Sequence, residues 1–463
     1  MVFSSLIFIF AYLTVTLAVY YIAPLKMRNL VLFIVSLAFY GWGEPRYIVL
    51  MIVSILIAYL FGFGIEKYRD INKRTAKLFL VLSLLGNLSF LLFFKYYNFF
   101  ATNIGFSVIE NLTLPVGISF YTFQIMSYSI DLYRGEVPLA KKFVPFGTYV
   151  TLFPQLIAGP IVRYKDVCDQ LDNRKETVSK FASGVTRFIT GLGKKLILGD
   201  SAAAVAEMIE RTNEFEPTVI GSWILMICYS FHIYFDFSGY SDMAIGLGRM
   251  IGFEFVENFN YPYIAKSITD FWRRWHITLS TWFREYIYIP LGGNRVGKLR
   301  GFLNLATVWF LTGFWHGADW NYILWGVYFW LFLVIEKAFL GKILAKVPII
   351  ARVYSLLIIG FGWIIFFYSD LSLIADTAKQ LFGIGTSFVG ESTSILYVLL
   401  RLLPFLAVCA LACTPIPKRI FNYVIARFPK MQLIASVATV LLFVVCIAYM
   451  VDNSFSPFLY YIF

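Results

Sequence analysis

Charged residues are scarce in this chain of 463 residues: they make up 14% of it, whereas soluble domains carry about a quarter. Hydrophobic residues make up 59%, and no polar stretch is long enough to form a soluble domain. A chain of several soluble domains is therefore excluded. The composition predicts an all-α polytopic membrane protein with one membrane domain over residues 1–463.

Cysteine and histidine are also few. The five cysteines show no Cys-x-x-Cys pair, which argues against a disulfide framework or a thiolate metal site. The three histidines (His232, His276 and His316) do not have the spacing of metal ligands, so we expect no metal. The net charge of +12 does not indicate nucleic acid, because the basic residues lie in short connections between apolar runs.

Long apolar runs are what the chain has in abundance. Since about 20 mostly apolar residues cross a bilayer, these runs predict eleven or twelve crossings. The predicted spans are 3–22, 29–43, 46–65, 78–99, 114–133, 184–205, 217–238, 301–317, 320–340, 350–368, 394–414 and 433–451. The apolar segment 145–160 is interrupted by glycine and proline, which predicts a re-entrant or protein-buried piece.

The charges of the connections predict an orientation. Basic residues gather in one set of connections, and the other set is neutral or acidic. The basic set includes 67–74, 163–175, 239–300 and 418–430, and the other set comprises 98–113, 207–216 and 370–391. By the positive-inside rule, the N-terminus and the C-terminus both lie outside a bacterial cytoplasmic membrane, with membrane lipids as partners.

One inner segment, 261–295, mixes aromatic and charged residues at near-helical spacing. Such a segment lies in the membrane interface or lines a polar cavity more readily than it spans lipid. A solvated amphipathic anchor without chemistry is the alternative interpretation.

Two of the histidines lie in tryptophan-rich runs, Phe-Trp-Arg-Arg-Trp-His at 271–276 and Gly-Phe-Trp-His-Gly at 313–317. With several further motifs, these runs resemble the membrane-bound O-acyltransferase (MBOAT) family, and within it the bacterial branch of alginate O-acetyltransferase membrane subunits. The further motifs are 114–121, 153–160, 235–242, 257–260, 288–295 and 457–460. The resemblance implies an MBOAT fold, with re-entrant and interfacial helices around a central tunnel and a motif-bearing catalytic core at 114–340.

The resemblance also implies roles for the two histidines. His316 falls on the catalytic histidine of the family pattern and is expected to act as a general base. Gly313 and Gly317 are expected to let a substrate approach its ring. His276 falls on the second histidine, which orients substrate, hydrogen-bonds the donor carbonyl or holds the fold near the tunnel. A core histidine that caps a buried carbonyl is the alternative for His316.

Arginine and tryptophan residues beside His276 are candidates for donor binding. Arg273 and Arg274 are expected to bind the phosphates of coenzyme A or of a phosphopantetheine, which suit the planar guanidinium group. Contact with phospholipid headgroups is an equally good interpretation. The other candidates for the tunnel lining are Trp272, Trp275, Trp315 and Asn260.

An acidic and hydroxyl cluster follows His232, the first histidine of the chain. It consists of Asp236, Ser238, Tyr240 and Asp242, and we expect a structural polar network first and a tunnel lining second. Buried carboxylates need partners, such as Arg249 or Arg273. His232 precedes Asp236 by four residues, which predicts a pair within one helix.

The resemblance implies an enzyme that moves an acyl group, most simply acetyl, from a cytoplasmic thioester across the membrane to hydroxyls of an exported or cell-envelope polysaccharide, either directly or through an extracytoplasmic partner. The donor is acetyl-coenzyme A or a phosphopantetheine-linked acyl carrier protein, and no tightly bound cofactor is expected. An extracytoplasmic SGNH-type acetyltransferase is the expected partner. The alternatives are D-alanyl transfer from a carrier protein to teichoic acid and, from another class, a transporter or flippase.

Overall fold

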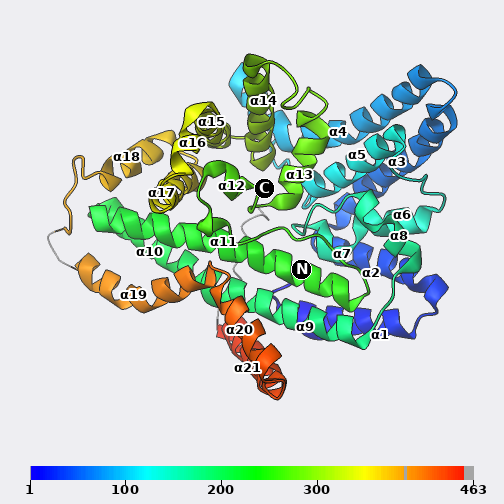
Figure 1. Cartoon of the computed structure of the whole chain (residues 1–463). Coiled ribbons are helices and arrows are strands. Elements are labelled where there is room, and N and C mark those ends of the chain that lie inside the picture. Colours follow the sequence, from blue (N-terminus) through cyan, green and yellow to red (C-terminus); the bar gives the residue numbers. More distant parts are fainter. Residues whose placement is uncertain (1, 391–393, 453–463) are drawn as a thin grey trace. The chain divides into compact units, whose positions relative to one another are not determined.

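The computed structural model describes residues 2–390 and 394–452. Within these ranges the regular structure is helical, apart from one isolated bridge between Thr218 and Ser387 (Figure 1). The prediction of an all-α protein is confirmed. The motif at 457–460 lies outside the described residues.

The described chain forms two compact units. The first comprises residues 2–191 and 240–257, and the second comprises 192–239 with the described part of 258–452. The long helix α11 (Val219–Met250) contributes its first part to the second unit and its last part to the first. The single membrane domain and its core at 114–340 stay predictions.

Long helices form the first unit, and α3, α4 and α5 pack against one another within it (Figure 1). The Asn72 side chain accepts hydrogen bonds from the first backbone N–H groups of α4, which ends at Gly105 in the left-handed conformation (φ 78°). Short π- and 3₁₀-helical turns are labelled η. The elements are η1 (Ile7–Leu13), α1 (Thr14–Ile22), η2 (Leu25–Met27), α2 (Arg28–Gly43), η3 (Pro45–Tyr47), α3 (Ile48–Arg69), α4 (Lys73–Ile104), α5 (Ile118–Arg134), α6 (Phe143–Thr151), α7 (Phe153–Leu156), α8 (Tyr164–Asn173) and α9 (Val178–Gly193).

The interrupted segment 145–160 forms two short helices, α6 and α7, inside the first unit. Their side chains are mostly buried, and α6 packs against α2, α3, α5 and α8. The Gln155 amide donates to the Tyr149 carbonyl, and the Thr148 hydroxyl donates to the Val144 carbonyl. The prediction of a protein-buried piece is therefore confirmed, because broken backbone is tolerated where protein covers it.

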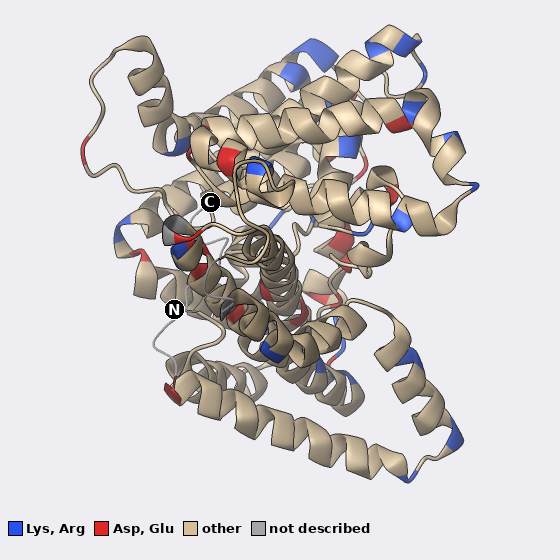
Figure 2. Ribbon diagram, turned by 90° about the vertical axis from the view of Figure 1, so that its left-hand side faces the viewer, with Lys and Arg blue, Asp and Glu red and all other residues tan. Residues whose placement is uncertain are grey.

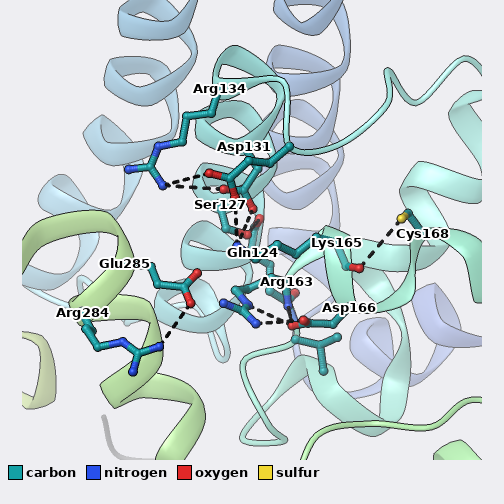
Figure 3. A network of polar contacts seen from close by, with 12 residues as sticks. Gln124, Ser127, Asp131, Arg134, Arg163, Lys165, Asp166, Cys168, Arg284 and Glu285 are labelled. Carbon is teal, nitrogen blue, oxygen red and sulfur yellow. Dashed lines mark hydrogen bonds and ion pairs between the residues drawn. The ribbon is translucent and has the colours of Figure 1, made fainter. Parts of the chain in front are cut away.

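A buried ionic network lies in the first unit (Figure 3). The Asp131 side chain is fully buried, and nitrogen atoms of Arg134 and Lys165 each lie 3.9 Å from its carboxylate. Arg163 and Asp166 form a closer pair nearby, at 2.9 Å. Charges buried at this position are thus balanced by opposite charges.

The second unit contains the histidine motifs. Its short helix α12 packs against α15 and α17, and α14 packs along α15. The elements are η4 (Lys194–Gly199), α10 (Asp200–Phe215), the first part of α11, η5 (Pro262–Ile264), α12 (Ile268–Trp272), α13 (Ile277–Phe283), η6 (Arg284–Tyr288), α14 (Lys298–His316), α15 (Trp320–Ile335), η7 (Glu336–Leu340), α16 (Gly341–Leu344), α17 (Pro348–Phe367), α18 (Leu371–Leu381), α19 (Ser394–Ala412), α20 (Ile416–Arg427) and α21 (Met431–Asp452).

Eight helical segments of the described chain are long and apolar enough to cross a membrane, against the eleven or twelve predicted. Charged residues occupy few positions along the ribbon (Figure 2). The eight segments are Leu25–Gly43, Pro45–Arg69, Lys73–Ile104, Val219–Met250, Trp320–Leu344, Pro348–Phe367, Ile395–Ala412 and Met431–Asp452. The other predicted spans fall on helices that are shorter, such as α5 with 17 residues, or less apolar, such as α14. The protein is a multi-pass membrane protein.

Candidate active site

A cavity of about 260 Å³ lies within the second unit and brings the two motif histidines together. It is bordered by α12, α13, η6, α14 and Leu333 of α15. The segment 261–295 therefore lines a cavity, although this cavity is mostly apolar and not the polar one that the sequence predicted. Five of the predicted site residues line it: Trp272, Arg273, Trp275, His276 and His316. Most of the remaining lining is apolar, and Trp309 and Phe283 are part of it.

His276 lies at the turn between α12 and α13 in an unusual backbone conformation. Its φ of +43° falls in the left-handed region, which costs a non-glycine residue about 1–3 kcal/mol. Two backbone hydrogen bonds hold the turn: Asn260 N–H donates to Arg274 at 2.9 Å, and Ile277 N–H donates to Asn258 at 3.0 Å. The side chain is 1% exposed, and burial lowers the pKa of His276 to about 3. The ring is therefore neutral at physiological pH.

The His276 ring is fixed by a buried amide. The Asn258 side-chain oxygen lies 3.1 Å from His276 Nδ1 and accepts hydrogen bonds from the backbone N–H and the hydroxyl of Thr278, at 3.2 and 2.9 Å. The Phe237 ring packs edge-on against the imidazole with a centroid distance of 4.8 Å. Sequence reasoning missed Asn258 and chose Asn260 from the same motif. Asn260 does not line the cavity, and its backbone supports the turn instead.

His316 lies in the last turn of α14 and is 3% exposed. Its imidazole meets the rings of Trp315, Trp325 and Phe366 at centroid distances of 5.0, 5.0 and 5.4 Å. Trp315 also reaches the His276 ring, at 6.1 Å, although it does not line the cavity itself. The aromatic rings surround His316 with apolar surface beside the cavity.

The glycines on either side of His316 do not open a path to its ring, contrary to the prediction. A Cβ atom on Gly313 would collide with the Tyr322 carbonyl oxygen of α15, and one on Gly317 would collide with the Tyr322 ring. Gly313 also lies against Gly326, whose Cα is 3.3 Å from the same added atom. These glycines instead allow α14 and α15 to pack backbone to backbone, which places His316 at the cavity.

The two arginines that the sequence predicted as joint donor-binding residues have different surroundings in the structure. Arg274 is tied to Asp270 at 2.9 Å and to the carbonyl of Asn260 at 3.3 Å, and it lines neither cavity. Arg273 is exposed and lines the histidine cavity. Of these two arginines, Arg273 is therefore the one placed to meet a ligand in the cavity.

A second cavity, of about 590 Å³, adjoins the first within the same unit. It is the more polar of the two, since three cationic side chains, those of Lys266, Arg273 and Lys337, line its wall together with the acidic side chain of Glu336. The two cavities share Thr269, Arg273, Tyr288, Leu305 and Leu333. An anionic group in the second cavity can therefore belong to the same molecule as a group beside the histidines.

Glu336 fixes the start of α12 and was also missed from the sequence. Its carboxylate accepts hydrogen bonds from the backbone N–H groups of Ile268 and Thr269, at 2.6 and 3.0 Å, and from the Thr269 hydroxyl at 2.7 Å. An anion at a helix N-terminus satisfies orphan N–H groups. It lies in the π-helical turn η7, a deviation often found at functional sites. No sequence motif marks this long-range contact.

The acidic and hydroxyl cluster contributes no residue to the histidine cavity. Asp236, Ser238, Tyr240 and Asp242 are absent from the lining of both cavities. The prediction that Arg249 or Arg273 pairs with these carboxylates is wrong. In the second unit Asp236 lies 3.4 Å from Lys195, and in the first unit Asp242 lies 2.8 Å from Arg187. The two carboxylates of the cluster are therefore held in ion pairs.

His232 also departs from its prediction. Its Nδ1 lies 3.1 Å from the carbonyl oxygen of Gly199, and the pair with Asp236 does not form. The carboxylate of Asp236 forms an ion pair with Lys195 instead, and the amino group of Lys195 also lies 2.7 Å from Asp200. The partners of His232 and Asp236 thus come from the neighbouring helix η4, whereas the sequence spacing predicted that the two residues pair with each other within one helix. No group of three or more potential metal ligands lies together in the described part of the chain.

Comparison with known proteins identifies the family. Residues 75–375 match the model of the membrane-bound O-acyltransferase family, a range that includes the histidine cavity. The chain is 42% identical over 402 residues to a probable alginate O-acetylase of Pseudomonas aeruginosa, covering 84% of this chain and 76% of that protein. It is 34% identical over 426 residues to the peptidoglycan O-acetyltransferase of Helicobacter pylori, covering 83% and 80%.

A more distant relative is the teichoic acid D-alanyltransferase of Streptococcus thermophilus, at 30% identity over 251 residues, covering 50% of this chain and 59% of that protein. The family match spans more than half of the chain, and the O-acetylating relatives are matched over most of their length. The chain belongs to the membrane-bound O-acyltransferase family and is a membrane O-acyltransferase.

Proposed function

We propose that this enzyme transfers an acetyl group from a cytoplasmic thioester to hydroxyl groups of a cell-envelope polysaccharide, with His316 as the general base. The observation that carries the proposal is the single cavity lined by His276, His316 and Arg273. The relatives named for alginate and peptidoglycan O-acetylation support the choice of acetyl and polysaccharide. The family assignment favours an enzyme over a transporter or flippase.

The proposed acyl transfer proceeds in simple steps. A hydroxyl oxygen attacks the thioester carbonyl carbon while His316 accepts the hydroxyl proton. The new C–O bond forms, the C–S bond breaks, and the proton passes from His316 to the departing thiolate. The aromatic rings of Trp315, Trp325 and Phe366 around His316 keep water from competing with the hydroxyl.

The cationic second cavity is the proposed entry for the donor. Lys266, Arg273 and Lys337 suit the phosphates of coenzyme A or of a carrier-linked phosphopantetheine. The shared wall then leads the pantetheine arm toward His276 and His316. No tightly bound cofactor is needed for this chemistry. On the outer side, the hydroxyl that receives the acetyl group belongs either to the polymer itself or to an extracytoplasmic SGNH-type acetyltransferase, which then passes the group to the polymer.

Purified protein in lipid nanodiscs provides the test. Labelled acetyl-coenzyme A is added with candidate acceptors, alginate or peptidoglycan fragments, with and without the SGNH-type partner. We expect label to leave the thioester only when an acceptor or the partner is present. Transfer of D-alanine from a carrier protein, without any acetyl transfer, would instead favour the activity for which the Streptococcus thermophilus relative is named.

The proposed orientation has its own test. We place both termini outside the cytoplasmic membrane because the basic connections lie on one side. A cysteine introduced at Ile109 or Ser387 should react with an impermeant reagent from outside, and one at Asn72 or Asn422 should not. The reverse labelling would overturn the orientation.

A further inference from the structure

The hydrogen bonds around Asn258 determine which nitrogen of His276 carries its proton. A backbone N–H group is only a donor, so the Asn258 atom that faces Thr278 N at 3.2 Å must be the amide oxygen. The Thr278 hydroxyl donates to the same oxygen. The orientation of this amide, which is often ambiguous, is therefore settled by its neighbours.

The same oxygen lies 3.1 Å from His276 Nδ1. An amide oxygen has no hydrogen to give, so a hydrogen bond at this distance requires the proton to be on Nδ1. In a neutral imidazole the other nitrogen, Nε2, then carries a lone pair. Asn258 is fully buried and does not line the cavity, whereas the His276 ring does. The ring edge held by Asn258 is thus turned away from the cavity.

We propose that Asn258 is a positioning residue that fixes His276 in the Nδ1–H tautomer, so that Nε2 presents a hydrogen-bond acceptor to the substrate. This inference rests on the proposed acyl transfer at the cavity. The tautomer excludes one of the roles predicted for His276, the hydrogen bond to the carbonyl of the acyl donor, since a nitrogen lone pair cannot donate to the thioester carbonyl. His276 instead orients an O–H or N–H group of the substrate, and the carbonyl oxygen must find its donor elsewhere.

Nitrogen NMR of protein labelled with ¹⁵N-histidine tests the tautomer independently of activity. The chain has three histidines, so comparison with His276→Gln assigns the signals. We expect a protonated Nδ1 and an unprotonated Nε2 on His276 at the pH of the transfer assay. A proton on Nε2 in the wild-type protein would overturn the proposal, whether or not acetyl transfer is detected.

Three variants separate positioning from a merely structural role. Asn258→Leu removes the acceptor, so His276 should leave the Nδ1–H form, and kcat/KM should fall about 100-fold through misplacement of the ring. Asn258→Asp keeps an acceptor oxygen and should retain the tautomer. Thr278→Val removes one competing donor and should also retain it. An unchanged tautomer or an unchanged turnover in Asn258→Leu would overturn the role of Asn258. If the wild-type protein and the variants show the expected tautomers but the wild-type protein transfers no acetyl group, the proposed function fails and the tautomer assignment stands.

Discussion

The second unit buries two groups of polar side chains, and they are built in opposite ways. Around Lys195, charges meet charges: its amino group lies 2.7 Å from Asp200 and 3.4 Å from Asp236, and it is 2% exposed. Around the histidine cavity, His276 and His316 pack against aromatic rings, and the cation Arg273 faces an open space.

The difference teaches how to recognise a site among costly buried groups. An ionisable residue inside a membrane protein is a functional candidate by default. The Lys195 group shows that ion pairing within the protein can account for such residues without a ligand. The histidine cavity offers space for a substrate beside polar groups, and neither Lys195 nor its two carboxylate partners line it.

His316 and His232 give the largest expected contrast between the two regions. His316→Ala should lower acetyl transfer about 100- to 10,000-fold, the usual cost of losing a general base. His232→Ala, which loses a contact to the Gly199 carbonyl beside the ion cluster, should leave transfer within a fewfold of wild type. Initial rates with labelled donor, at matched protein levels in the membrane, measure both. Similar transfer rates for the two variants would contradict the assignment of catalysis to the histidine cavity and of a structural role to the ion cluster.

Lys195→Met tests the ion cluster through stability. Removing one partner of a buried ion pair typically costs about 3–5 kcal/mol, because the remaining carboxylates lose their compensating charge. Thermal unfolding in detergent should show a large drop in midpoint, partly restored by adding Asp236→Asn. Transfer at temperatures where the variant is folded should be near normal. A stable variant without activity would place the cluster in the catalytic machinery.

Arg273 and Arg274 are adjacent in sequence, and the structure gives them different roles. Arg273→Ala should raise the donor KM about 10- to 100-fold, the loss of a charge-assisted hydrogen bond of about 1.5–3 kcal/mol. Arg274→Ala, which breaks the contact with Asp270, should change stability more than donor KM. Steady-state kinetics with varied donor separates them. An unchanged donor KM in Arg273→Ala would return this residue to contact with lipid headgroups.

Glu336→Gln gives the smallest expected effect. The amide places an NH₂ group where the carboxylate accepts hydrogen bonds from Ile268 or Thr269, so the start of α12 should shift. We expect a fall in kcat of about tenfold or less, with a smaller change in KM. Asp376→Asn, on the exposed face of α18, is the matched loss of one carboxylate charge. Equal behaviour of the two variants would contradict a role for Glu336.

The helical membrane fold could be predicted from the sequence, and both cavity histidines could be selected as candidates, because these rest on local patterns. Apolar runs and the tryptophan-flanked histidines are visible without knowledge of the packing. Asn258 and Glu336 could not be predicted as supports, since Asn258 acts 18 residues away from His276 and Glu336 acts 68 residues away from Ile268. The glycines near His316 were misread for the same reason: their space is filled by Tyr322 of another helix.

The placement of the acyl donor tests the central claim most directly. A pantetheine thioester with a photoreactive diazirine in its acyl group, bound to the purified protein and irradiated, marks the residues beside the reacting carbonyl. Peptide mapping should find the label on the cavity segments, 268–288 and 305–316, and excess acetyl-coenzyme A should reduce it. Label confined to the Lys195 cluster or to segments outside the cavity would contradict the assignment of this site.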